Sequence, residues 1–253
     1  MPSKNISFLN ANGIELAARL DMPQTEPLGY ALMAHCFSCS KDVFAMTHIS
    51  ESLVARGMGV MRFDFTGLGQ SKGTFADSHF SANIEDIRSA VKYLETHAKP
   101  PEILLGHSLG GTAILATAHE VPSAKIVATI GSPYDPSHVE HFFDGLREHM
   151  SEDAEVCITL AGRKFIINRE FIDNLDDHRM NEAIRGIKGH VVVFHDPDDE
   201  VVEVENARCI YQAATHPKSF ISLPGAGHLL LKEKDAELVA SVIVALIKHQ
   251  HHS

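Results

Sequence analysis

A serine between two glycines stands where an apolar run passes into a helical pattern. Residues 106–110 read Gly-His-Ser-Leu-Gly, follow the apolar run 103–105 and lead into the helical pattern 112–118. In this setting the serine lies at the tip of a sharp, strained turn that exposes its hydroxyl. Side chains in place of the glycines would collide with the flanking strand and helix. The pattern therefore predicts Ser108 as a nucleophile, whereas a chance occurrence of the motif in a loop would lack the flanking elements.

Two other stretches accompany this motif. Residues 61–71 read Met-Arg-Phe-Asp-Phe-Thr-Gly-Leu-Gly-Gln-Ser, and residues 34–42 read Ala-His-Cys-Phe-Ser-Cys-Ser-Lys-Asp. With the serine motif, they make the chain resemble α/β-hydrolases over essentially its whole length. The first stretch resembles the Asp-x-x-Gly-x-Gly-x-Ser loop of the esterase and serine-aminopeptidase-like members. The second more narrowly resembles the hydrolase half of bacterial proteins that fuse an α/β-hydrolase to an OsmC-like domain, and we expect the chain to correspond to that half alone.

The base expected for Ser108 is a histidine after the last strand. A serine hydroxyl reacts poorly at neutral pH unless a base accepts its proton, and the family order along the chain is Ser, acid, His. Residues 223–228 read Leu-Pro-Gly-Ala-Gly-His and end the last apolar run, so a tight glycine-rich turn can carry His228 over the sheet edge. The chain has 17 histidines, and the alternative is an ordinary surface histidine. Its position and the preceding turn favour His228 as the base.

The acid that orients this base should follow the preceding strand, where three aspartates are available: Asp196, Asp198 and Asp199. Family members that resemble this stretch read His-Gly-x-x-Asp-x-x-Val. Aligning that pattern with residues 195–202 places Asp199 at the acid and Val202 at the valine, and puts Asp196 where the glycine usually stands. Asp199 is therefore the predicted acid, with Asp196 or Asp198 in reserve. The spare carboxylates could instead cap the next helix.

Two backbone N–H groups are candidate donors to the oxyanion that forms when a serine attacks a carbonyl. One belongs to Leu109, the residue after the nucleophile. Relatives read His-Gly-Phe-x-Gly in the loop after the strand at 30–34, where this chain reads His-Cys-Phe-Ser-Cys at 35–39. The resemblance implies that Phe37 supplies the second N–H. A backbone donor does not depend on the preceding side chain, provided that Cys36 can adopt the dihedral angles of the loop.

Cys36 and Cys39 replace both glycines of that loop. A Cys-x-x-Cys pair can be a redox pair or half of a zinc site. Cys157 and Cys209 stand at no ligand spacing, so we expect no metal and interpret Cys36 and Cys39 as small residues that line the substrate pocket. A thiol-redox protein stays an alternative from another class. Four cysteines make no disulfide framework in a chain of this size, and we expect a cytoplasmic protein.

The elements that must position these residues follow from the apolar pattern. Alternating runs at 6–9 and 14–20 flank Asn-Ala-Asn-Gly, a strong hairpin signal. Later strands are short continuous apolar runs separated by helical patterns such as 84–94 and 238–247, which is typical of parallel strands covered on both faces. We predict an α/β-hydrolase fold, a mostly parallel, doubly wound sheet that opens with an antiparallel hairpin. The parallel strands are expected at 30–34, 60–65, 103–105, 126–130, 191–194 and 219–223.

A long insertion interrupts this alternation after the strand at 126–130. We divide the chain into an α/β-hydrolase core, 1–132 and 189–253, and a small cap, 133–188, because a loop of this length usually has its own structure and often covers a site. The apolar side chains of the cap are predicted to line a modest pocket suited to short or medium acyl chains. Alternatively, they form only the cap's own core. They include Phe142, Phe143, Leu146, Phe165 and Phe171.

Composition argues against several other classes. The 253 residues include 22 Lys and Arg against 33 Asp and Glu, a net charge of −11 that disfavours nucleic acids and anionic lipid as partners. No apolar run approaches the roughly 20 residues of a membrane span. Residues 1–20 lack the apolar core of a secretion signal.

We therefore predict a carboxylesterase-type serine hydrolase that acts on small carboxylic esters through an acyl-enzyme, with no cofactor. Thioester hydrolysis and peptide cleavage use the same machinery and stay open. The dehalogenase and epoxide-hydrolase branches place an aspartate where this chain has Ser108. A protein that binds ligands without turnover is the remaining alternative, and the presence of nucleophile, acid and base together argues against it. The oligomeric state and the natural substrate are left open.

Overall fold

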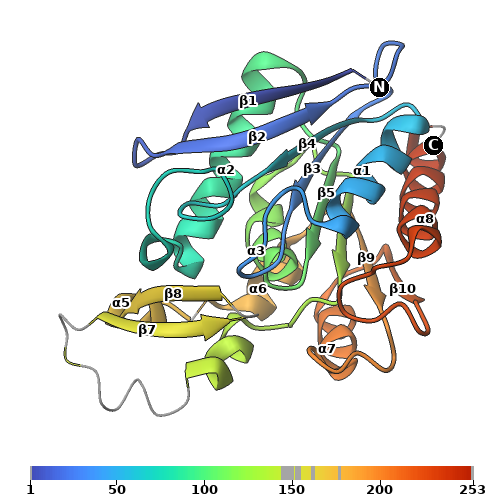
Figure 1. Cartoon of the computed structure of the whole chain (residues 1–253). Helices are drawn as coiled ribbons and strands as arrows, with labels where there is room; N and C mark the ends of the chain where they lie inside the picture. The colour runs from blue at the N-terminus through green and yellow to red at the C-terminus, as the bar shows by residue number, and fades with distance from the viewer. Residues whose placement is uncertain (1, 144–150, 152–154, 161–162, 176–177, 252–253) are drawn as a thin grey trace.

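One eight-stranded sheet forms the centre of the molecule. The computed structural model describes residues 2–143, 151, 155–160, 163–175 and 178–251. The strand order is β1-β2-β4-β3-β5-β6-β9-β10, and all neighbours from β4 to β10 are parallel (Figure 1). The predicted mostly parallel sheet is therefore confirmed. The parallel strands are β3 (Tyr30–Ala34), β4 (Gly59–Phe63), β5 (Ile103–His107), β6 (Ile126–Ile130), β9 (His190–His195) and β10 (Lys218–Ser222).

The antiparallel hairpin at the start of the chain is also confirmed. β1 (Ser3–Leu9) pairs with β2 (Glu15–Asp21), and β2 continues antiparallel onto β4. The turn is held by Asn10, whose side-chain oxygen accepts the N–H groups of Asn12 at 3.0 Å and Ile14 at 2.9 Å. The Asn10 side chain therefore satisfies two backbone N–H groups of the turn that have no partner in the strand pairing.

Helices cover both faces of the sheet, which explains why its strands are continuous apolar runs. Successive strand residues point to opposite faces. In β3, Leu32 packs in one core and Met33 in the other, and Leu104 and Leu105 of β5 divide in the same way. The helices on the Met33 face are α1 (Phe44–Ala55) and α8 (Glu233–His251), and those on the Leu32 face are α2 (Phe80–His97), α3 (Leu109–Thr117) with its extension η2 (Ala118–Glu120), α6 (Met180–Gly186) and α7 (Glu205–Ala213).

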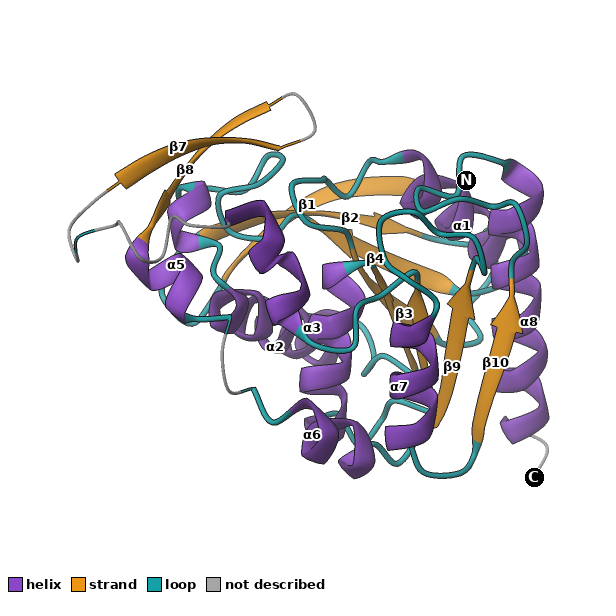
Figure 2. Ribbon diagram, turned by 90° about the horizontal axis from the view of Figure 1, so that it is seen from below, coloured by secondary structure: helices purple, strands orange, loops and turns teal. Residues whose placement is uncertain are grey.

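The segment between β6 and β9 carries a second, two-stranded sheet. β7 (Glu155–Leu160) pairs antiparallel with β8 (Arg163–Asn168), and α5 (Arg169–Asp173) follows. The hairpin stands apart from the main sheet in two perpendicular views (Figures 1 and 2). η3 (Pro136–Phe143) precedes it, and α6 closes the segment by packing on α3 and α7.

Within the described ranges, none of the helices combines the length and the apolar composition that a bilayer crossing requires.

Candidate active site

Ser108 is the single residue between the end of β5 and the start of α3. Its dihedral angles are φ +53° and ψ −130°, a conformation that residues with a side chain rarely adopt. A Cβ on Gly106 would overlap the backbone of α3, and one on Gly110 would lie 2.8 Å from the carbonyl oxygen of Ala34. The strained turn and the steric need for both glycines are therefore as the sequence predicts.

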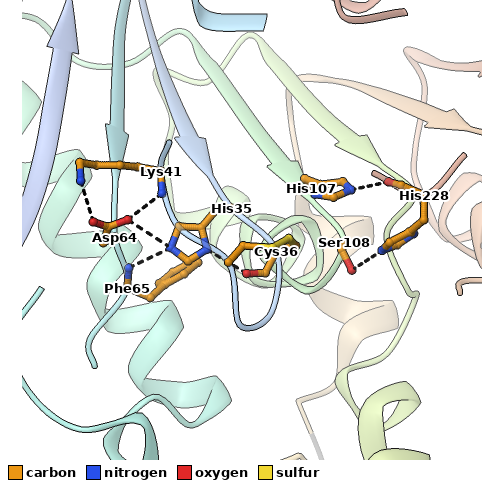
Figure 3. The surroundings of a disulfide bond; sticks show 9 residues. His35, Cys36, Lys41, Asp64, Phe65, His107, Ser108 and His228 are labelled. Atoms are coloured by element: carbon orange, nitrogen blue, oxygen red, sulfur yellow. Dashed lines mark hydrogen bonds and ion pairs between the residues drawn. A yellow bond between two sulfur atoms is a disulfide. The ribbon is translucent and has the colours of Figure 1, made fainter. Parts of the chain in front are cut away.

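The three predicted catalytic side chains form one hydrogen-bonded chain. His228 Nε2 lies 3.1 Å from Ser108 Oγ (Figure 3), and His228 Nδ1 lies 2.8 Å from Asp199 Oδ2. A carboxylate can only accept, so Nδ1 carries the proton and Nε2 is left to accept from the serine hydroxyl. Ser108 is 8% exposed and Asp199 7% exposed. The arrangement can transfer a proton from the serine to the imidazole.

Asp199 is fixed through both of its oxygens. Oδ1 accepts the N–H groups of Val201 at 2.8 Å and Val202 at 3.0 Å, while Oδ2 faces His228. Burial by itself would raise the pKa of Asp199, but the hydrogen bonds from His228 and from these backbone N–H groups outweigh it and lower the pKa. Asp199 therefore stays a carboxylate beside the imidazole.

Asp196, which stands in place of a family glycine, has a different contact. Its carboxylate accepts the N–H groups of Gly225 at 3.2 Å and Gly227 at 2.6 Å, in the turn that precedes His228. Burial opposes ionisation here too, but these bonds and the N–H of Asp198 lower the pKa of Asp196. Asp198 is exposed. Of the three aspartates, Asp199 contacts the imidazole and Asp196 holds the turn that carries it.

One glycine at the site escaped the sequence analysis. Gly131 follows β6 with φ +52°, and a Cβ there would lie 3.2 Å from Asp199 Oδ2 and 3.3 Å from His228 Nδ1. A larger residue would press on the acid–base pair. A glycine directly after a central parallel strand was the available signal, since ligands bind at this edge of such sheets.

The loop after β3 corrects the interpretation of the two cysteines. Cys36 and Cys39 are not separate small side chains but are joined in a disulfide, with their Cα atoms 5.3 Å apart. A turn brings them together, because the N–H of Cys39 donates to the carbonyl of Cys36 at 3.1 Å. Cys36 is buried beside Ser108 (Figure 3). Spacing alone could not distinguish this bond from a reduced redox pair or half of a zinc site.

The same loop presents the peptide that joins Cys36 to Phe37. The Cys36 carbonyl accepts from His35 Nδ1 at 2.8 Å as well as from Cys39. In a planar trans peptide the following N–H, that of Phe37, points the opposite way. Leu109 is the first residue of α3, where N–H groups have no partner within the helix. Phe37 and Leu109 as oxyanion donors stay a prediction that this arrangement permits.

A buried ion pair closes the other end of this loop. Asp64, in the 61–71 stretch, accepts from Lys41 through the backbone N–H at 2.6 Å and through Nζ at 2.8 Å. It also accepts the N–H of Gln70 at 2.9 Å, and a Cβ on Gly69 would overlap its carboxylate. Both ionic side chains are almost fully buried. The Asp-x-x-Gly-x-Gly pattern therefore makes room for the Asp64 carboxylate, and this carboxylate binds Lys41 in the loop after β3.

A sequence model of the α/β hydrolase family matches residues 31–242. The chain belongs to the α/β-hydrolase family. Among solved structures of the fold, the crystal structure of an esterase domain from a Rhodothermus marinus protein is 43% identical, covers 97% of each chain and has a TM-score of 0.79.

Two curated relatives are more distant. Mouse mitochondrial palmitoyl-protein thioesterase ABHD10 is 27% identical over 251 residues, which cover 96% of this chain and 82% of that protein. A monoacylglycerol lipase of Mycolicibacterium smegmatis is 27% identical over 191 residues, 75% of this chain. The match spans 65% of the lipase's own length, slightly under two thirds.

In this α/β-hydrolase, aromatic rings join the inserted segment to the loop after β3. The ring of Phe37 lies 5.4 Å from Phe75 in η1 (Phe75–Asp77) and 6.0 Å from Phe171 in α5, and Phe165 of β8 lies 4.3 Å from Phe75. The insertion therefore packs directly on the predicted oxyanion loop.

The other predicted pocket residues are not located by these contacts. Phe142 and Phe143 belong to η3, but their side chains, like the whole of Leu146, lie outside the described residues. In the part of the chain that is described, no group of three or more His, Cys, Asp or Glu side chains is placed to hold a metal ion.

Proposed function

We propose that this protein is a serine hydrolase that cleaves small carboxylic esters through an acyl-enzyme intermediate. The observation that carries the proposal is the continuous hydrogen-bonded chain Ser108–His228–Asp199 at the carboxyl ends of the parallel strands. Its geometry is that of a nucleophile, a base and an orienting acid. The sequence similarity to a named esterase domain supports ester substrates.

In the proposed mechanism Ser108 Oγ attacks the carbonyl carbon of the ester while His228 Nε2 takes its proton. Asp199 holds the other ring nitrogen protonated and stabilises the imidazolium that forms. The N–H groups of Phe37 and Leu109 donate to the developing oxyanion. His228 then protonates the leaving alcohol, and water, activated by the same imidazole, hydrolyses the acyl-enzyme.

The insertion is proposed to act as a cap (133–188) over this site. Phe171 contacts the ring of Phe37, next to the proposed oxyanion donor, and Phe165 contacts Phe75, which itself packs on Phe37. An apolar pocket of modest size at that point would favour acyl chains of short or medium length over long lipids. The disulfide Cys36–Cys39 would form part of the wall of this pocket.

A thioester is the second candidate substrate. The match to a palmitoyl-protein thioesterase over 96% of the chain supports it, and the same catalytic residues would serve. In a thioester the leaving group is a thiolate that needs less protonation, so thioester cleavage should depend less on His228 as an acid in the first step.

A substrate panel tests the proposal. We would measure kcat/KM for p-nitrophenyl esters of graded acyl length and for thioesters with the same acyl groups. Ser108→Ala should abolish turnover of the preferred class, whereas Ser241→Ala, on the outer helix α8, should not change it. Hydrolysis that survives in Ser108→Ala, or no hydrolysis of any acyl substrate by the wild type, would reject a serine hydrolase.

A further inference from the structure

Three buried histidines outside the catalytic chain stand at the carboxyl ends of three strands. His35 follows β3, His107 ends β5 and His195 ends β9, and each is at most 1% exposed. Because the strands are parallel, all three rings lie at the edge of the sheet that carries the site. Fully buried histidines are uncommon and call for a partner.

Each ring meets a backbone carbonyl in a different loop of the site. His107 Nε2 lies 2.7 Å from the carbonyl oxygen of His228 itself (Figure 3). His195 Nε2 lies 2.8 Å from the carbonyl of Val202, and His35 Nδ1 lies 2.8 Å from that of Cys36. One histidine thus serves the base, one the acid loop and one the predicted oxyanion loop.

The contacts show which ring nitrogen carries a hydrogen. A carbonyl oxygen only accepts, so the ring nitrogen that faces it carries the hydrogen. His35 Nε2 then accepts the N–H of Phe65 at 3.3 Å. Within the described residues, Nδ1 of His107 and of His195 has no hydrogen-bond partner. In each case a ring N–H donates to a main-chain carbonyl of the site. His35 Nε2 and His195 Nε2 also lie 3.9 Å from the carboxylates of Asp64 and Asp199.

Each bond acts within one residue of a catalytic contact. Val202, held at its carbonyl by His195, donates its N–H to Asp199 Oδ1 at 3.0 Å. The peptide held by His35 is the one whose N–H belongs to Phe37. His107 binds the carbonyl of the base, and its ring lies 5.1 Å from the His228 ring. Losing one of these bonds would free the main chain at one catalytic group.

We propose that His35, His107 and His195 are positioning residues, hydrogen-bond donors that hold the oxyanion loop, the base and the acid loop in place relative to Ser108. The inference rests on the proposed hydrolase activity and goes beyond it, because none of the three touches the reacting atoms. Misplacement of a catalytic group by about 1 Å can lower the rate by about 10²-fold.

His107 offers the most direct experiment. The side-chain amide of glutamine reaches the position of Nε2, whereas that of asparagine reaches only Nδ1, and leucine has no donor. We expect His107→Leu and His107→Asn to lower kcat for p-nitrophenyl acetate by about 10–10²-fold with little change in KM, and His107→Gln to retain most of it. His190→Leu, at the opposite end of β9 and bonded to Ser219, is the matched control and should leave kcat unchanged.

A double-mutant cycle separates positioning from general damage. If His107 acts through His228, His107→Leu should cost less than about 2-fold in a His228→Ala background, because the imidazole that it positions is already absent. His195→Leu in Asp199→Asn should behave likewise, and it replaces the first cycle if His107→Leu fails to fold by circular dichroism.

Two results would overturn the proposal. One is an equal loss in both backgrounds, and the other is the same kcat for the Gln, Asn and Leu variants. A failure of the proposed function looks different, since Ser108→Ala would then keep its turnover, and the positioning role would fall with it.

Discussion

The two sides of the site are built by different means. On the proposed acid–base side, two side chains meet: Asp199 Oδ2 and His228 Nδ1 lie 2.8 Å apart. Asp199 also accepts the N–H of Val202, and the carbonyl of His228 accepts from His107. On the proposed oxyanion side, the loop after β3 offers main-chain groups and is held by the Cys36–Cys39 disulfide and by the Lys41–Asp64 ion pair.

The difference explains which residues the chain can replace. A side-chain contact depends on one residue type, so the acid–base side keeps its aspartate and histidine at the positions that the family pattern predicts. A main-chain donor depends only on backbone shape. Cysteine can therefore stand where relatives have glycine, since the disulfide now holds the turn. Single substitutions on the acid–base side should therefore lower kcat severely, and changes on the oxyanion side should lower it by smaller factors.

The largest effect is expected from the nucleophile and the base. Ser108→Ala and His228→Ala should each lower kcat by about 10⁵–10⁶-fold, and the double variant should lose little more, because the groups act as a unit. Steady-state hydrolysis of p-nitrophenyl esters measures this. Losses that multiply in the double variant would mean that the two residues act independently.

Substitution of the aspartates should give the next largest effect, and the loss of kcat should be much larger for Asp199 than for Asp196. Asp199→Asn should lower kcat by about 10³–10⁴-fold, because the amide favours the wrong tautomer of His228. Asp196→Asn keeps an acceptor for the turn before His228 and should cost about 10-fold or less. The assay is kcat at neutral pH with thermal melting as a check on folding. An inactive Asp196→Asn beside an active Asp199→Asn would reverse the assignment.

Patterns along the chain sufficed to predict the sheet and to select Ser108 and His228, which lie within hydrogen-bond distance of each other. Continuous apolar runs predicted the six parallel strands. The two glycines around Ser108 predicted a tight turn, in which the flanking backbone leaves no room for a side chain at either glycine. These features are local, since each depends on neighbours within a few residues. Asp199 needed the family pattern, because three aspartates in four positions have the same local signal.

The contacts that hold the site could not be predicted because they join distant residues. His107 and the carbonyl that it binds are 121 residues apart, and Asp196 and Gly227 are 31 apart. In the sequence His107 is one unassigned letter of the serine motif. The disulfide is local, but its spacing fits three kinds of chemistry. Only the fold of the turn decides among them.

Reduction of the disulfide should have a smaller, graded effect. A dithiol reductant supplies two electrons and two protons, leaves Cys36 and Cys39 as thiols and frees the turn that holds Phe37. We expect kcat to fall by about 10-fold, below the 10²–10³-fold that complete loss of one oxyanion donor costs. Thiol titration should rise from two groups to four, and reoxidation should restore the rate.

The matched control is the Cys36→Ala, Cys39→Ala double variant. It should show the lowered rate from the start and no response to reductant. Alkylation without reductant should modify only Cys157 and Cys209, the two free cysteines. A rate that still responds to reductant in the double variant would remove the disulfide from the oxyanion side.

The smallest expected effect concerns stability and again sets the acid–base side apart. Burial, and the nearby His228, lower the pKa of His107 from 6.5 to about 4. Between these values the unfolded chain binds more protons than the folded one, so the free energy of unfolding should decrease as pH falls from 6.5 to 4. His107→Gln cannot bind this proton and should show a shallower decrease, while His97→Gln, at an exposed histidine, should follow the wild type. Asp196 and Asp199 have lowered pKa values, so their contributions to the free energy of unfolding are lost only below pH 3.8 and do not overlap this window.

Urea unfolding at pH 4.5, 5.5, 6.5 and 7.5 measures how steeply the free energy of unfolding depends on pH. Equal slopes for wild type and His107→Gln would show that His107 is not held neutral by the fold, and the acid–base side would then lack one of the buried donors assigned to it.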